Sequence, residues 1–376
     1  MNQTYYKENI LRRSLKYKKI LRKLGFKIFL RKIGILKQKK ILYLSCHSVL
    51  EYDEISLLKE LGHYVYSPGD YVDNKKPGKP WLRPLPKQSK REQLDAEYLF
   101  SYGKKNQENK YALKKKFIDR FDIVIIMHHP RFIIENWDAI KHKSVIWRTI
   151  GQSNPEIEKQ LERFRHEGLK VVRYSPLEKN LDNFIGFDEI IRFYKDPNEF
   201  KGWRNSKNRV LTIGINMEER FDACHFDIYQ KVTKDIPSTL YGSGNNNVSN
   251  RELTYQQIKD ALKDFRCYFY TGTYPASYTL TFIEAWMTGI PIIAIGNKLM
   301  HDRFTDVKLY EIPKIITNGV NGYCANDVSS LKKIIVSLMK DDKKLKEISK
   351  NGRISAIKLF GKKNIKRQWE AYLDKL

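Results

Sequence analysis

The chain has 376 residues, of which 41% are apolar and 12% aromatic, so a disordered chain is excluded and two domains of ordinary size are possible. Seventy Lys and Arg against 43 Asp and Glu give a net charge of +27, which favours an anionic partner. No uncharged apolar run of about 18 residues occurs, and the four cysteines stand far apart, so we expect no membrane span, no disulfide framework and no zinc knuckle.

The first 40 residues hold fourteen Lys or Arg and one Glu, about half of the net charge. Between residues 8 and 36, apolar side chains recur at spacings of three, four and seven, which predicts an amphipathic helix with a basic face, broken or kinked at Gly25 and Gly34. We predict that residues 1–39 form a basic arm on an anionic membrane surface. The protein would then be cytoplasmic and peripherally attached to the inner face of the membrane.

From residue 40 onward, apolar strands alternate with helices, which predicts parallel β-α-β units. We assign residues 40–200 to an N-terminal Rossmann-like domain, interrupted by a Pro- and Lys-rich insertion at about 72–120. The predicted strands are 39–48, 63–70, 121–129, 143–151, 169–175 and 189–197, and the predicted helices are 53–62, 130–140 and 155–168.

A polar, turn-rich stretch at 195–208 is typical of an interdomain linker. A second Rossmann-like domain is predicted over residues 201–355, followed by a helix over 356–376 that packs back toward the first domain. Its predicted strands are 209–216, 238–245, 266–273 and 291–296, and its predicted helices are 217–235, 254–265 and 278–289. Parallel sheets bind ligands at the carboxyl ends of their strands, so two facing sheets define a cleft.

The stretch TGTYPASYTLTFIEAWMTGIPIIAIGN, residues 271–297, carries a strand end, a loop and a helix start. The amides of Tyr278, Thr279 and Leu280 would open the helix without intrahelical partners, and the positive end of the helix dipole would lie behind them. Such a helix start is a phosphate site. Glu284, about one and a half turns further, is placed to accept hydrogen bonds from ribose hydroxyls.

The run from Ser277 to Ala294 resembles the signature of retaining GT-B-fold glycosyltransferases of the "group 1" (family 4-like) type: Glu, seven residues, Glu-Ala, then Gly-x-Pro and a strand. The segments LTIGINMEER and ITNGVNGYCANDV resemble further parts of the same family. The resemblance is strong over about 207–376, weaker over 41–200 and absent over 1–40. It implies a GT-B fold, with two Rossmann-like domains facing across a cleft.

The resemblance also implies transfer of a sugar from a nucleotide-diphosphate sugar, with retention and without a metal, the nucleotide-sugar being a substrate rather than a cofactor. In the family pattern Glu284 binds the ribose and the amides at 278–280 bind phosphate. The chain departs from the pattern at Ala276, which replaces the first Glu, and at Ile215, which stands where Arg is usual. Arg220 stands where Lys is usual and can neutralise the leaving diphosphate.

Further candidates surround this core. Ser277 completes the donor-binding segment, Tyr274 and Tyr278 are candidates for stacking on a base or sugar, and three glycines would let the backbone approach the nucleotide: Gly214, Gly242 and Gly244. On the N-terminal side, His128 stands at a strand end where the family often has a sugar-contacting His, and Gly151-Gln152 occupies another such position. His47 is a candidate base on the acceptor side.

The leading hypothesis is a glycosyltransferase that acts on a glycan or lipid-linked acceptor in surface polysaccharide or glycolipid synthesis. Two alternatives stay open: a sugar transferase associated with nucleic acid, because basic arms also bind phosphates, and a catalytically silent nucleotide-sugar binder, because of Ala276 and Ile215. Each candidate side chain also has an ordinary structural interpretation, as a solvated surface group or a turn residue.

Overall fold

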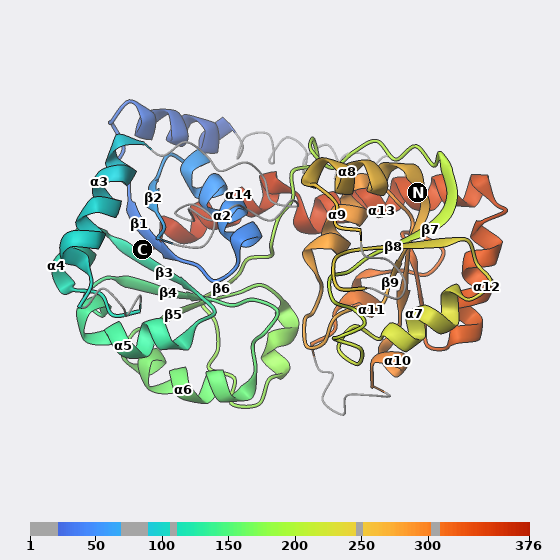
Figure 1. Cartoon of the computed structure of the whole chain (residues 1–376). Helices are drawn as coiled ribbons and strands as arrows, with labels where there is room; N and C mark the ends of the chain where they lie inside the picture. Colours follow the sequence, from blue (N-terminus) through green and yellow to red (C-terminus); the bar gives the residue numbers. More distant parts are fainter. Residues whose placement is uncertain (1–21, 69–88, 106–110, 246–250, 302–308) are drawn as a thin grey trace, which may run out of the picture.

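The computed structural model describes residues 22–68, 89–105, 111–245, 251–301 and 309–376. Two parallel sheets lie side by side, each with helices on both faces (Figure 1). This arrangement confirms the predicted α/β class with two Rossmann-like domains. No helix of the described ranges is long and apolar enough to cross a membrane.

The N-terminal sheet has the strand order β2-β1-β3-β4-β5-β6, and every pairing is parallel. Its central strand has the sequence IVIIM and is buried along its whole length, as expected for a strand covered on both faces. The strands are β1 (Lys40–Leu44), β2 (Tyr64–Tyr66), β3 (Ile123–Met127), β4 (Ser144–Arg148), β5 (Lys170–Arg173) and β6 (Glu189–Ile190). The helices are α2 (Ser48–Glu60), α3 (Lys90–Tyr98), the π-helical η1 (Leu99–Gly103), α4 (Lys115–Ile118), α5 (Pro130–Ile140), α6 (Pro155–His166) and the 3₁₀ turn η2 (Pro176–Asn180).

The C-terminal sheet has the order β11-β10-β9-β7-β8 and is likewise parallel. Its strands are β7 (Lys207–Ile213), β8 (Ser238–Tyr241), β9 (Phe265–Tyr270), β10 (Ile292–Ile295) and β11 (Tyr323–Ala325). Its helices are α7 (Phe226–Thr233), α8 (Tyr255–Asp264), α9 (Leu280–Thr288), α10 (Asn297–His301), α11 (Ile312–Ile315), α12 (Val328–Leu338) and α13 (Asp342–Phe360). The last helix, α14 (Lys362–Leu373), follows α13 after one residue.

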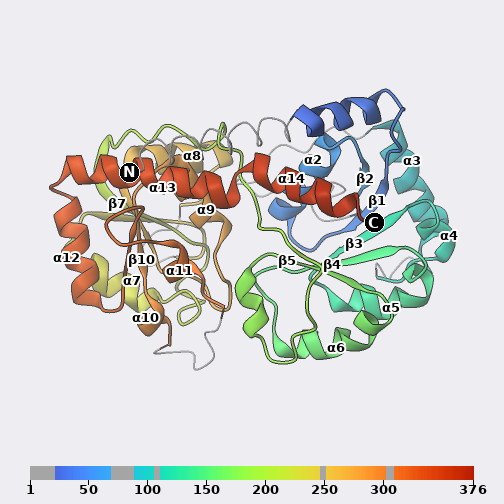
Figure 2. The same ribbon diagram turned by 180° about the vertical axis from the view of Figure 1, so that it is seen from behind.

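The chain passes between the domains twice, and the two crossings lie against each other. Lys195, on the way out, bridges in parallel to Gly361, on the way back. The amide of Lys195 donates to the carbonyl of Phe360 at 3.0 Å, and the amide of Lys362 donates to the carbonyl of Lys195 at 3.2 Å. Figure 2 shows that α13 covers the C-terminal domain, whereas α14 lies on the N-terminal domain beside α2.

The described part of the basic arm is a helix over residues 22–32, here called the arm helix. It runs through Gly25 without a break, so the predicted interruption there is wrong, and it ends just before Gly34, which has a φ of +79°. Arg31 is buried and attaches the arm helix to α14, donating to Glu370 at 2.8 Å and to Asp374 at 3.3 Å. Residues 1–21 lie outside the described ranges.

Three predicted elements differ in the structure. The helix expected over 217–235 begins only at Phe226, because His225 adopts a left-handed conformation (φ 52°) that no continuous right-handed helix contains. The strand expected over 189–197 pairs only at Glu189–Ile190, since the chain then leaves the sheet to cross between the domains. The segment 195–208 is therefore not a purely polar linker, and Lys195 at its start is fully buried.

Candidate functional site

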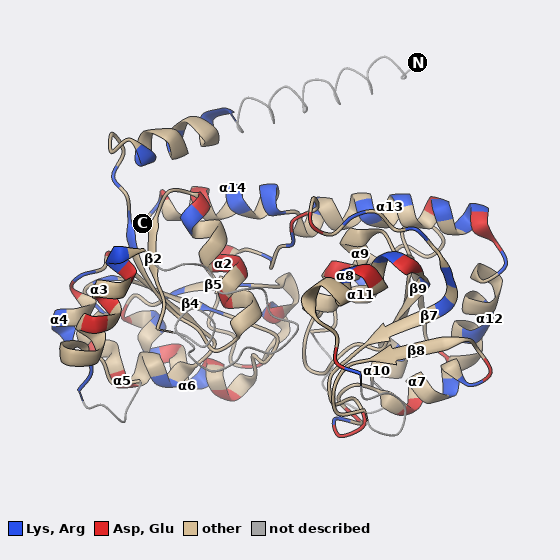
Figure 3. Ribbon diagram, turned by 45° about the horizontal axis from the view of Figure 1, so that its top comes forward, with Lys and Arg blue, Asp and Glu red and all other residues tan. Residues whose placement is uncertain are grey.

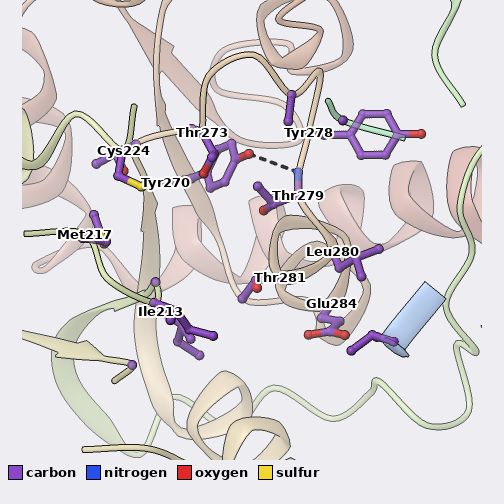
Figure 4. A pocket seen from close by; sticks show the side chains of 18 of the residues that line it. Ile213, Met217, Cys224, Tyr270, Thr273, Tyr278, Thr279, Leu280, Thr281 and Glu284 are labelled. Carbon is purple, nitrogen blue, oxygen red and sulfur yellow. Dashed lines mark hydrogen bonds between the residues drawn. The ribbon is translucent and has the colours of Figure 1, made fainter. Parts of the chain in front are cut away.

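A cavity of about 470 Å³ lies between the two domains. Its walls come from the segments after β1 and β4 on the N-terminal side, and from the segments after β7, β8 and β9 on the C-terminal side. All of these segments follow the carboxyl ends of parallel strands, which is where such sheets bind ligands. The first turn of α9 forms part of the same wall (Figure 4).

The start of α9 provides free amides at the cavity. Thr279 is the N-cap, and its hydroxyl accepts from the amide of Phe282 at 3.3 Å. The amides of Leu280 and Thr281 have no hydrogen-bond partner among the described residues, and both residues line the cavity. An anion placed there would meet two N–H groups and the positive end of the helix dipole.

The amide of Thr279 is not free, in contrast to the prediction. It donates to the hydroxyl of Tyr270 at 3.1 Å, a contact drawn in Figure 4. Burial raises the pKa of Tyr270, so the phenol stays protonated and neutral. The Thr279 side chain still lines the cavity, but its backbone N–H belongs to the scaffold of the helix start.

Ser277 and Tyr278 form hydrogen bonds across the interdomain contact, and Tyr278 also lines the cavity. Ser277 is fully buried: its amide donates to the Tyr174 hydroxyl at 2.9 Å, and that hydroxyl donates to the Ser277 side chain at 3.1 Å. The Tyr278 hydroxyl donates to the carbonyl of Tyr174 at 2.6 Å, and its ring packs edge-on against Phe193 and Phe360. Figure 4 shows the Tyr278 ring directed away from Leu280 and Glu284. Ser277 therefore lies outside the cavity, whereas Tyr278 lines it with its hydroxyl already bonded, and the predicted donor contacts of both residues stay predictions.

Glu284 lines the cavity one turn into α9, and its carboxylate forms a buried ion pair. Its Oε1 lies 2.6 Å from Nζ of Lys195, which also donates to Oδ2 of Asp53 at 3.1 Å. Asp53 comes from α2 in the N-terminal domain, so one ammonium group joins carboxylates of both domains. Within the described part of the chain, Oε2 of Glu284 has no polar partner and remains available to a ligand.

The three glycines of the prediction lie in two loops that touch each other. A Cβ on Gly242 (φ +133°) would lie 2.0 Å from the carbonyl oxygen of Gly214, and a Cβ on Gly244 (φ +74°) would lie 2.0 Å from the Asn216 side chain. Buried Asn245 joins the loops by donating to the carbonyls of Gly214 and Gly242 at 2.8 and 2.9 Å. Gly214 and Gly242 line the cavity, whereas Gly244 serves the packing of the loops.

Arg220 and Tyr274 both line the cavity, and their predicted roles stay predictions. Arg220 lines the cavity, is exposed, and forms no ion pair with any carboxylate in the described ranges. Tyr274 lines the cavity and is half-buried, with its amide donating to the carbonyl of Ala223 at 2.8 Å. Ile215 occupies an exposed part of the same wall. Arg220 is therefore a cation placed to meet an anionic ligand.

On the N-terminal side, the structure separates the two histidine candidates. His47 lines the cavity as the N-cap of α2, and its Nδ1 accepts from the amide of Leu50 at 3.4 Å. Burial, and then the charge of Lys195, lower the pKa of His47, so its imidazole is held neutral. His128 does not line the cavity, and its pKa is lowered to about 4, first by burial and then by His129. The structure thus places His128 outside the cavity lining, and its predicted sugar contact stays a prediction.

Ala276, which replaces the family glutamate, lies directly against the N-terminal domain. A Cβ on Gly151 would lie only 2.8 Å from the Cβ of Ala276. Both residues, with Gln152, line the cavity at the point where the domains touch. Gly151 has no side chain and Ala276 has only a methyl group, so the two loops can approach each other closely across the cleft.

Sequence reasoning missed Lys195 and Asp53. The available signal was weak: a single lysine after the apolar run EIIRFY, and an aspartate in a helix whose neighbours are mostly apolar. Across the described ranges, no group of three or more His, Cys, Asp or Glu side chains has the arrangement of a metal site.

No protein-family model matches the chain, and no curated protein matches it in sequence. Similar solved structures do exist. One is HepE of Anabaena in complex with UDP and glucose, with 13% identity over 90% of this chain and 100% of that chain and a TM-score of 0.55. Another is a glycosyltransferase from Rickettsia africae, with 15% identity over 90% and 99% of the two chains and a TM-score of 0.56. The chain therefore has the GT-B fold.

Proposed function

We propose that the protein is a glycosyltransferase that moves a sugar from a nucleotide-diphosphate sugar to a glycan or lipid-linked acceptor. The observation that carries the proposal is one interdomain cavity containing the free amides of Leu280 and Thr281, the Glu284 carboxylate and the Arg220 guanidinium. HepE, which shares the fold, was solved with UDP and with UDP-glucose, so UDP is the first nucleotide to examine.

The cavity suggests how a donor would lie. The diphosphate would accept hydrogen bonds from the Leu280 and Thr281 amides and pair with Arg220, and the ribose hydroxyls would donate to Oε2 of Glu284. The base would lie against the loops of Gly214 and Gly242, which line the cavity. Acceptor hydroxyls would approach from the His47 side. Because Nδ1 of His47 accepts from the Leu50 amide, Nε2 of the neutral ring carries the proton and would donate to an acceptor oxygen.

Catalysis would follow from charge stabilisation. As the glycosidic bond breaks, negative charge grows on the leaving diphosphate. Two fixed donors and one cation stabilise that charge more strongly than they stabilise the bound donor. We propose retention of configuration and a diphosphate neutralised by Arg220 and the α9 dipole rather than by a metal ion, on the basis of the "group 1" resemblance.

A binding assay tests the proposal directly. Thermal unfolding would be recorded with UDP, GDP, ADP and dTDP and with their glucose conjugates, because a ligand of the native state raises the melting temperature. We expect one base to stand out, and the Glu284→Ala variant to lose that shift. Glu162→Ala, on an exposed face of α6, is the matched control and should keep it.

A second assay measures release of free nucleotide from the preferred nucleotide-sugar in the presence of candidate acceptors. Release would support the enzyme. Binding without release under any acceptor would favour the catalytically silent binder, and no binding of any nucleotide would refute the proposal.

The arm helix supports a further part of the proposal, attachment to the inner face of an anionic membrane in surface polysaccharide synthesis. It exposes Phe26 and Phe29, 61% and 53% accessible, beside a high density of Lys and Arg (Figure 3). Exposed aromatic side chains among cations fit an interface of acyl chains and anionic headgroups. Attachment there would bring the cavity close to a lipid-linked acceptor.

Sedimentation with vesicles of phosphatidylglycerol and phosphatidylcholine tests this part. We expect Phe26→Ser/Phe29→Ser to reduce binding and Ile354→Ser, an equally exposed apolar residue on α13, to leave it unchanged. Equal binding by all three proteins would contradict the proposal, and preferential retention on duplex DNA would favour the nucleic-acid alternative.

A further inference from the structure

Lys195 occupies an unusual position for a basic residue. Its side chain has no exposed surface, and its ammonium group lies between two carboxylates, at 2.6 Å from Glu284 and 3.1 Å from Asp53. The side chains of these acids are 11% and 4% exposed. An unpaired charge at this depth would be strongly unfavourable, so each of the three groups depends on the others for charge compensation.

The three groups come from three different parts of the chain. Asp53 belongs to α2 of the N-terminal domain, Glu284 belongs to α9 of the C-terminal domain, and Lys195 lies on the crossing between them. The neighbouring Tyr194 hydroxyl donates to the carbonyl of Asp53 at 2.6 Å, which holds the crossing against α2. The ion triad therefore fixes the crossing to both domains at once.

The backbone of Lys195 also joins the two crossings. Its amide and carbonyl bond to Phe360 and Lys362, on either side of the single residue that separates α13 from α14. A change in the angle between the domains must alter these backbone contacts of Lys195. The side chain of Lys195 also holds the Glu284 carboxylate at the cavity wall. Glu284 and the interdomain hinge are thus connected through one side chain.

We infer that Lys195 is a positioning residue: it orients the Glu284 carboxylate toward the ribose of the donor and, through Asp53, holds the domains in the arrangement that closes the donor site. This inference rests on the proposed function. With Oε1 held by the ammonium group, Oε2 faces the cavity in a single orientation. Without Lys195, Asp53 and Glu284 would be two buried carboxylates without a shared cation, and Glu284 would rotate away.

The test compares UDP with 2′,3′-dideoxy-UDP, which lacks the ribose hydroxyls, by isothermal titration calorimetry. If the ribose hydroxyls donate to the Glu284 carboxylate, the unmodified protein should bind UDP about 10- to 100-fold more tightly than 2′,3′-dideoxy-UDP. We expect Glu284→Gln and Lys195→Met each to reduce that preference to about threefold or less, and the double variant to reduce it no further, because both substitutions act on the same contact.

Arg192→Met is the matched control. Arg192 lies three residues before Lys195 and also joins the domains through a largely buried ion pair, with Glu311 at 2.8 Å, but it does not line the cavity. If Lys195 were only structural, Lys195→Met and Arg192→Met would both lower the melting temperature and both keep the preference for UDP over 2′,3′-dideoxy-UDP. If Lys195 positions Glu284, only Lys195→Met loses that preference.

A second variant guards against misfolding of Lys195→Met. Lys195→Gln/Asp53→Asn removes the cation and one of the two carboxylates, so only one buried acid of the triad is left without its cation. This variant should also lose the preference for UDP over 2′,3′-dideoxy-UDP. Retention of the preference in the folded variants would overturn the inference alone. Failure of the unmodified protein to bind UDP or any other nucleoside diphosphate would instead overturn the proposed function on which the inference rests.

Discussion

Substitution of Gly151 by Ala tests the contact between the two domains. The new Cβ would lie 2.8 Å from the Cβ and 3.4 Å from the Cα of Ala276. Both atoms are fixed to backbone, so no flexible side chain can move aside. Restoring an ordinary contact of about 3.4 Å requires the two loops to separate by about 0.6 Å at the edge of the cavity.

The cost is that of overpacking, about 1–3 kcal/mol of unfolding free energy. Ala276→Gly should relieve it, because that substitution removes the opposing Cβ. Alone, Ala276→Gly should cost only about 0.5–1 kcal/mol through the greater freedom of glycine in the unfolded chain. The double variant Gly151→Ala/Ala276→Gly should therefore be more stable than Gly151→Ala.

Thermal unfolding of the four proteins measures the coupling, and small-angle scattering of the same samples measures any opening of the cleft. We expect the double variant to lose less unfolding free energy than the two single variants lose in sum, because the two residues are in contact. Simple additivity of the two single effects, or a Gly151→Ala variant as stable as the unmodified protein, would show that the domains do not meet here in solution.

Three further outcomes are expected. Arg220→Met should weaken UDP binding by about 10- to 100-fold, with Arg209→Met as the control. Its melting temperature should not change, because Arg220 is exposed and has no ion-pair partner in the described ranges. Arg148→Met should lower the unfolding free energy, measured in urea titrations, by about 3–5 kcal/mol. The reason is that the buried Glu54 carboxylate, 2.6 Å from the Arg148 guanidinium group, would lose its cation. Adding Glu54→Gln to the same chain should recover part of this loss. The pKa of His63 is lowered to about 4, first by burial, so the unfolded chain binds its proton more readily. Stability should therefore fall as the pH drops from about 6.5 toward 4, by about 2 kcal/mol at pH 5, and a His63→Leu variant that retains this share of the pH dependence would contradict the assignment.

The fold class could be predicted because its signals are local. Buried parallel strands such as Ile123–Met127 are nearly continuous apolar runs, and each is followed by a helix with its own start signal, as at Pro130 and Pro155. The start of α9 was predicted to within two residues for the same reason, because a strand end, a short loop and a closing glycine follow one another in the sequence. The threonine cap was not part of that prediction.

The parts of the site that were missed depend on contacts between distant segments. Lys195 is 142 residues from Asp53 and belongs to a stretch whose composition resembles a linker. The side chain of Tyr278 looked available to a ligand, and only the position of Tyr174 on the other domain shows that its hydroxyl is already bound. Composition near a residue does not reveal which domain will cover it.

The placement of α14 has a consequence for synthesis on the ribosome. Its Trp369 is fully buried and the guanidinium group of Arg148 lies over its ring, at 5.7 Å from the centroid, so a helix that follows the whole second domain in the chain completes the wall of the first domain. Domains usually fold in the order in which they emerge, but here the first must wait until the second has been made. We therefore expect nascent chains arrested before residue 362 to expose an unfinished surface around α2 and to be the species on which chaperones act.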